Sequence, residues 1–354
     1  PDSRSGHRRL AVDEAPGAGV DTVEKWMWFP RPGFSMPTIP TRAGQVAFAP
    51  RVAGSQFQKG AMMVDFWWGN FEALLPSTHE RLKQKGFQWV KIDPPWDYRQ
   101  IDPLPVITNE GISHAYPDAR LDLHLSRIRG DGLRAMMSPQ ICCVDVTRAP
   151  FSPQWWDAWF PQFERYVMYF VAAAERNGVE YLALSGDNFV LDRKPPAYKE
   201  KLEAIFAKAK AAYKGKLGHV LFQGGVGTEI HELLPRPAEL PFVDRWDFFA
   251  INLWAPLAQR NDPTQEEVDA SVRRVFDLRL RALWQQYGKP IVLQQVAYPS
   301  VDGGLMGKVQ VDDPATALWE PYSEKYAFDP GEQAMAFEAG TGSMWVGTDK
   351  GLYK

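Results

Sequence analysis

Carboxylate side chains in this sequence recur at or just after the ends of short apolar segments. Asp93 ends one such segment, Asp187 follows another, and Glu229 lies a few residues after a third. Two carboxyl groups held near each other can serve as general acid and general base in a hydrolysis. Asp187, Glu229 and Asp93 are therefore the candidate catalytic residues.

Aromatic and short polar side chains occupy the same segment ends. A flat aromatic face can stack on the apolar face of a sugar ring, and amide or carboxylate groups can hydrogen-bond to its hydroxyls. These residues predict a carbohydrate as the ligand. The candidate substrate-binding residues are Asp65, Trp67, Trp68, Trp96, Gln140, Asn188, Asn252, Trp254, Gln295 and Tyr298.

Each of these residues also has a purely structural interpretation. Asp187 could cap the helix that follows it, and Gln295 could be a hydrogen-bonded amide of the core. The indole rings at the segment ends could pack inside the fold. A second Trp group, at 155, 156 and 159, has helical spacing and is expected in the core.

The sequence shows no pattern that indicates a metal or a cofactor. The six His are scattered, and His231-Glu232 lacks the second His of a zinc-binding HExxH helix. The two cysteines, Cys142 and Cys143, are adjacent and are expected to be buried thiols, because a bridge between neighbours would close almost no loop. We therefore expect no metal and no cofactor.

Short apolar segments alternate with helix-like segments, which predicts a parallel α/β sheet. The first strand-to-helix turn has no GxGxxG or Walker A motif, so a closed (β/α)8 TIM barrel is favoured over a doubly wound nucleotide fold. In such barrels the site lies at the carboxyl ends of the strands. The predicted strands are 61–68, 87–93, 133–142, 179–184, 219–223, 246–254 and 290–296, and the predicted helices are 77–85, 121–129, 152–177, 196–214 and 264–287.

Three regions are expected along the chain. Residues 1–54, rich in Pro and Gly, predict an extended N-terminal arm. Residues 55–340 form the barrel, and 341–354 form a C-terminal tail that could also open a further domain. The eighth βα unit is the weakest, with a helix expected at 332–339 and a strand at 343–346.

The overall composition excludes several classes of protein. The 354 residues carry a formal charge of −3, which gives no electrostatic basis for binding nucleic acid. The longest apolar run, residues 166–174, is too short to span a membrane, which takes about 20 residues. Residues 1–10 have no apolar signal-peptide core, so we expect any such signal to be absent or already removed. We expect a secreted or cell-surface protein, and a cytoplasmic location is the alternative that the sequence leaves open.

Several stretches resemble the clan-A glycoside hydrolases, particularly β-mannanase-like barrels. The resemblance implies a TIM barrel with glycosidase activity, an acid/base residue at Asp187 and a nucleophile position at Gln295. Two departures stand out: Asp187 is one methylene shorter than the family's Glu, and Gln295 cannot attack as a carboxylate does. The matching stretches are Ser138-Pro139-Gln140, Trp155–Phe160, Asn177–Glu180, Ser185–Asp187 and Gly288–Ser300.

Three mechanisms stay open on these residues. Retaining hydrolysis needs a second carboxylate about 5–5.5 Å from the first, and an inverting pair of Asp187 with Glu229 or Asp93 would stand about 6.5–9.5 Å apart. In substrate-assisted cleavage an N-acetyl group of the sugar is the nucleophile, and Asp187 or Asn188 orients it.

Other functions also stay open. The second hypothesis is a catalytically inactive barrel that binds glycan or serves as a structural subunit of a surface assembly, with the N-terminal arm reaching a protein partner. A hydrolase of another kind on the same barrel is a third.

Overall fold

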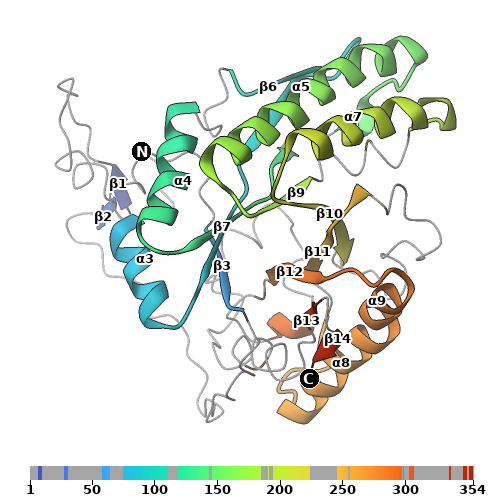
Figure 1. The fold of residues 1–354 in the computed structure, drawn as a ribbon. Coiled ribbons are helices and arrows are strands. Elements are labelled where there is room, and N and C mark those ends of the chain that lie inside the picture. Colours follow the sequence, from blue (N-terminus) through green and yellow to red (C-terminus); the bar gives the residue numbers. More distant parts are fainter. Residues whose placement is uncertain are drawn as a thin grey trace.

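The computed structural model describes most of the barrel and parts of both ends of the chain (Figure 1). The described residues are 7–9, 28–30, 58–63, 75–110, 118–142, 146–184, 190, 194–223, 245–253, 256–296, 298, 303–306, 335, 346–348 and 351–353.

Seven parallel strands form the central sheet, and neighbours in the sheet are also neighbours in sequence. Cα atoms of the two edge strands come within 8 Å of each other, so the sheet curls into a nearly closed barrel (Figure 1). The predicted TIM-barrel class is confirmed. The strands are β3 (Gly60–Met63), β4 (Trp89–Ile92), β7 (Arg134–Met137), β9 (Tyr181–Leu184), β10 (Lys216–Gln223), β11 (Phe248–Leu253) and β12 (Ile291–Val296).

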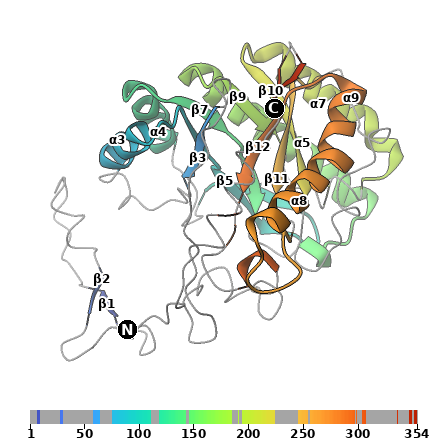
Figure 2. The ribbon, with the colours of Figure 1, turned by 90° about the horizontal axis from the view of Figure 1, so that it is seen from below.

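Helices cover the outside of this sheet (Figure 2). They are α3 (Leu75–Gln84), α4 (Asp118–Gly130), α5 (Pro153–Asn177), α7 (Lys199–Ala212), α8 (Gln265–Val275) and α9 (Arg281–Tyr287), with the π-helical turn η5 (Phe276–Leu280) joining α8 to α9. Single 3-10 turns are η1 (Val146–Arg148), η2 (Pro196–Tyr198) and η6 (Gly304–Met306). No helix of the described part is both long and apolar enough to cross a membrane.

Two short antiparallel pairs lie toward the chain ends. Within the region expected to be an arm, β1 (His7–Arg9) pairs with β2 (Trp28–Pro30). Near the C-terminus, β13 (Val346–Thr348) pairs with β14 (Gly351–Tyr353). Among the described residues no eighth strand joins the parallel sheet. The helix expected at 332–339 lies outside the described residues except for the helical, buried Met335.

Helix α5 begins and ends where its sequence predicts. The Ser152 hydroxyl accepts a hydrogen bond from the Trp155 amide, and Gly178 takes the left-handed conformation (φ 62°) that ends the helix. The helix predicted to begin at residue 77 begins earlier, because α3 already starts at Leu75. Pro76 explains the earlier start, since proline is well suited to a first helical turn.

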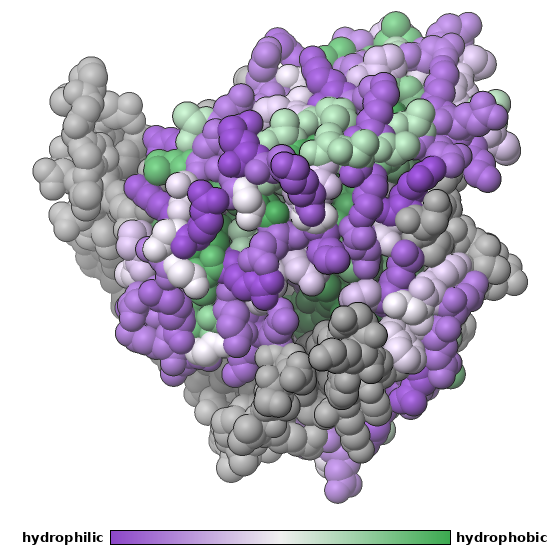
Figure 3. Space-filling model, viewed as in Figure 1, coloured by the Kyte–Doolittle hydropathy of each residue, from purple (hydrophilic) through white to green (hydrophobic). Residues whose placement is uncertain are grey.

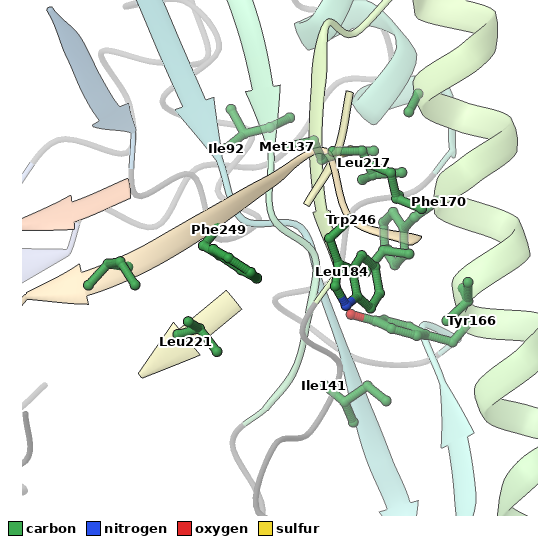
Figure 4. Packing of buried hydrophobic residues seen from close by; sticks show 14 of the residues in the cluster. Ile92, Met137, Ile141, Tyr166, Phe170, Leu184, Leu217, Leu221, Trp246 and Phe249 are labelled. Atoms are coloured by element: carbon green, nitrogen blue, oxygen red, sulfur yellow. The ribbon is translucent and has the colours of Figure 1, made fainter. Parts of the chain in front are cut away.

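The aromatic side of α5 is core, as predicted. Trp155, Trp156 and Trp159 are fully buried, and the indole N–H of Trp159 donates to the Tyr98 hydroxyl at 2.9 Å. Farther along α5, Tyr166 and Phe170 point toward the strands and lie near Leu184, Leu217 and Trp246 (Figure 4). Three of the 14 Trp of the chain therefore help to fix one helix to the barrel wall.

Two barrel strands continue past the mouth as a smaller sheet, a feature that the sequence analysis missed. We expected the second strand to end at residue 93 and 133–142 to be one unbroken strand. Instead β5 (Pro95–Gln100) follows β4, and β8 (Gln140–Cys142) follows β7, with β6 (Val106–Thr108) antiparallel to β5. Pro94 and Pro139 interrupt the two strands at the same level, because proline donates no ladder hydrogen bond.

Large side chains close the amino end of the barrel interior. The ring of Tyr181 contacts those of Trp89 and Phe248, with centroids 5.0 and 4.9 Å away. The Arg134 guanidinium lies 3.9 Å from the Trp89 ring centroid and pairs with the Glu180 carboxylate.

On the outer surface of the protein, Figure 3 shows mainly hydrophilic residues with smaller hydrophobic areas between them.

His219 lies on the outer side of β10, where its ring stacks on Trp246 with centroids 5.0 Å apart. Burial lowers the pKa of His219 to about 4, against an opposing hydrogen bond with the Leu184 backbone. Its Nδ1 atom is buried, with no hydrogen-bond partner among the described residues. The folded protein therefore holds this ring in its neutral form.

This burial predicts a specific loss of stability in acid. The unfolded chain binds a proton at His219 near pH 6.5 and the folded chain only near pH 4, so stability falls as the pH drops through that window. From pH 7 to pH 5 we expect His219 to cost about 2 kcal/mol. His219→Phe should remove that part of the pH dependence in urea unfolding, and equal losses in both proteins would contradict it.

Candidate functional site

The predicted site residues fall into two groups, those that the structure describes and those that lie outside its described ranges. Those within the described residues are Asp93, Trp96, Gln140, Asn252, Gln295 and Tyr298. Outside the described residues lie Asp187, Glu229, Asp65, Trp67, Trp68, Asn188 and Trp254. The geometry below therefore concerns two parts of the barrel mouth, one after β4 and β7 and one at the ends of β11 and β12.

The first part is a buried ion pair with an amide neighbour. Lys91 on β4 is 5% exposed and Asp93, directly after β4, is 1% exposed. The Lys91 ammonium lies 2.6 Å from Asp93 Oδ2, and the same oxygen accepts a hydrogen bond from Gln140 Nε2 at 3.0 Å. Gln140 reaches Asp93 because β8 lies beside β5, with Gln140 in register with Pro95.

This arrangement limits the chemistry that Asp93 can perform. A cation within hydrogen-bond distance favours the ionised carboxylate, and both contacts are donors to the same oxygen. An ionised carboxylate can accept a proton or stabilise positive charge, and it cannot supply a proton first. Among the predicted catalytic residues, Asp93 thus suits the role of base and not that of acid.

The second part is a β-bulge between β11 and β12. Ile251 is in register with Leu293, but the next residue, Asn252, is in register with Gln295, so Gln294 is the extra residue. Leu293 and Val296 pack outward against the helix layer. Gln294 and Gln295 therefore lie between two residues whose side chains point outward. A bulge of this kind turns two consecutive side chains to the same side of the sheet.

Asn252 lies on the inner side of β11, since it follows the inward-facing Phe248 and Ala250 at two-residue spacing. Its Oδ1 accepts a hydrogen bond from Gln294 Nε2 at 2.7 Å. Gln294 is a functional candidate that the sequence analysis left out of its site. The only signal in the sequence was the Gln-Gln pair at a strand end, and it did not say that both side chains turn inward.

Two of the residues predicted to bind the sugar, Trp96 and Tyr298, are buried in the core. Trp96 is 4% exposed, and its ring contacts Tyr166, Tyr169 and Phe170 of α5. Neither face of its indole is open to a sugar in this position. Tyr298 is also buried, and burial raises the pKa of its hydroxyl.

No group of three or more His, Cys, Asp or Glu side chains within the described ranges could hold a metal ion. The polar side chains described above at these strand ends are one carboxylate, one ammonium and several amides. This set suits hydrogen bonding to a polar, uncharged ligand.

Comparison with known proteins gives likeness of structure only. No family model and no curated protein matches the sequence. A GH113 β-1,4-mannanase in a complex superposes with a TM-score of 0.59 at 18% identity, covering 82% of this chain and 85% of that one. The GH113 β-mannanase from Alicyclobacillus acidocaldarius, in complex with ManMIm, gives 0.58 at 17%, covering 81% and 82%.

The fold is a barrel of the kind seen in the GH113 β-mannanases. The resemblance drawn from the sequence is confirmed at the level of the fold, since GH113 β-mannanases are among the structures that superpose on this chain. In this barrel, the Lys91–Asp93 pair and the Asn252–Gln294 pair both lie at the edge where the fold places its sites.

The buried ion pair predicts a strong dependence of stability on both partners. Lys91→Met would leave the Asp93 carboxylate buried without its cation, which should cost about 3–5 kcal/mol in urea unfolding. The double variant Lys91→Met/Asp93→Asn should recover most of that loss. Lys201→Met, which breaks the exposed pair with Asp157, should cost less than about 1 kcal/mol. A Lys91→Met loss as small as that of Lys201→Met would contradict the account.

Proposed function

We propose that this barrel hydrolyses a polysaccharide or another glycan, with Asp187 as the acid/base residue. The observation that carries the proposal is the polar set at the carboxyl ends of β4, β11 and β12, on a fold shared with GH113 β-mannanases. Carbohydrate sites need short hydrogen-bonding side chains that converge from several strands, and this edge supplies them.

An inverting mechanism fits these residues best. Asp187 would protonate the glycosidic oxygen as that bond breaks, while Asp93 would take a proton from the water that attacks the anomeric carbon. The ionised state of Asp93 beside Lys91 supports the role of base. Gln295, at the position where the resemblance implies a nucleophile, argues against a retaining route. Glu229 is the alternative base.

A second function is favoured by one specific observation. The bulge at the end of β12 carries two carboxamides where a retaining glycosidase would need a carboxylate. The barrel would then bind glycan without cleaving it, or serve as a structural subunit of a surface assembly that residues 1–54 join to a protein partner. In both cases we place the protein outside the cell or on its surface, where polysaccharides are found.

The substitution Asp187→Asn separates these functions. Unmodified protein and variant would be assayed for release of reducing ends from mannans, glucans and chitin-type oligomers, and for binding of the same ligands by calorimetry. We expect hydrolysis to fall by about 10²–10⁴-fold, because the proton donor is lost, while binding persists.

Asp157→Asn, at an exposed carboxylate of α5, is the matched control and should retain full activity. Unchanged hydrolysis in Asp187→Asn would disprove the assigned role. Binding without hydrolysis in the unmodified protein would favour the inactive barrel.

A further inference from the structure

Gln294 has a buried acceptor atom that the described part of the protein leaves unused. Its side chain is among the buried polar groups, at 7% exposure. Nε2 donates to Asn252 Oδ1 at 2.7 Å, whereas Oε1 is buried and has no hydrogen-bond partner among the described residues. Buried acceptors of this kind are rare in folded proteins, because they lose their hydrogen bond to water without replacement.

The position of this atom indicates a ligand and not a packing defect. The bulge turns Gln294 to the inner side, between the outward Leu293 and Val296, at the carboxyl edge of the barrel. The hydrogen bond to Asn252 fixes which end of the carboxamide remains available. Bulges often occur next to active sites, where they re-aim a side chain.

We propose that the Gln294–Asn252 pair is a sugar-binding element, in which Gln294 Oε1 accepts a hydrogen bond from a hydroxyl group of an uncharged sugar ring. This inference rests on the proposed function and adds a specificity-determining residue to it. Asn252 acts as the positioning residue, since it holds the Gln294 carboxamide in one orientation.

Charge at the mouth selects against acidic sugars. An unpaired carbonyl oxygen repels a carboxylate, and the Lys91–Asp93 pair adds no net positive charge at the same edge. Lys91, the one cation that the described strands place inside the barrel near this edge, is already paired with Asp93. A uronic acid would therefore bring a carboxylate to a site with no free cation among the described residues.

The test compares three proteins and three ligands. The proteins are the unmodified chain, Gln294→Met and the matched control Gln286→Met, which changes an exposed glutamine of α9. The ligands are a β-1,4-manno-oligosaccharide, an N-acetylated chito-oligosaccharide and an anionic oligogalacturonate. Calorimetry gives Kd for each pair, and thermal unfolding gives Tm for each protein.

We expect the unmodified protein and Gln286→Met to bind at least one neutral oligosaccharide equally and the oligogalacturonate not at all. Gln294→Met should bind that neutral ligand about tenfold more weakly. Its Tm should fall by no more than about 5 °C, because methionine removes an acceptor that had no partner and only the single hydrogen bond to Asn252 is lost.

Three results would overturn the inference. Equal binding by Gln294→Met would show that Oε1 meets no sugar, and preference for the oligogalacturonate would contradict the charge argument. A Tm lowered by more than about 5 °C would exceed the loss of the Asn252 hydrogen bond alone and would show that a protein donor also satisfies Oε1. Failure of the proposed function looks different, since the unmodified protein and the control would then also bind none of the oligosaccharides, and the inference would fall with it.

Discussion

Backbone hydrogen bonding between parallel strands decides which side chains enter this barrel. Successive residues of a strand point to opposite faces, so a shift of one residue exchanges the inner and outer sets. The seven strands keep one register except at the bulge, where Asn252 pairs with Gln295 and Gln294 is inserted. That single irregularity brings two carboxamides to the inner side, and the chemistry proposed for this half of the mouth depends on it.

The other half of the mouth depends on two proline interruptions and one aromatic helix. Pro94 and Pro139 break β4 and β7 at the same level, so the chain continues as β5 and β8 in a separate sheet. The rings of α5 hold this smaller sheet through contacts to Trp96 and a hydrogen bond to Tyr98. Gln140, at the start of β8, is thereby held within hydrogen-bond distance of Asp93.

The sequence predicts the features that local chemistry controls. The alternation of apolar strands and helices, the bounds of α5 and its buried Trp positions were all readable from residue type and spacing. Asp93 and Asn252 were correctly placed at strand ends. The bulge at Gln294 and the burial of Trp96 were not readable, because both arise from contacts between segments far apart in sequence.

The central claim is that a sugar binds at the carboxyl ends of the barrel strands, between the Asp93 and Gln294 sides of the mouth. A crystal structure with a bound neutral oligosaccharide tests it most directly. The account predicts a sugar hydroxyl within about 3.2 Å of Gln294 Oε1, with the sugar ring inside the barrel mouth. A sugar on the outer helices or at the amino end of the barrel, with Oε1 bonded to a protein donor, would contradict it.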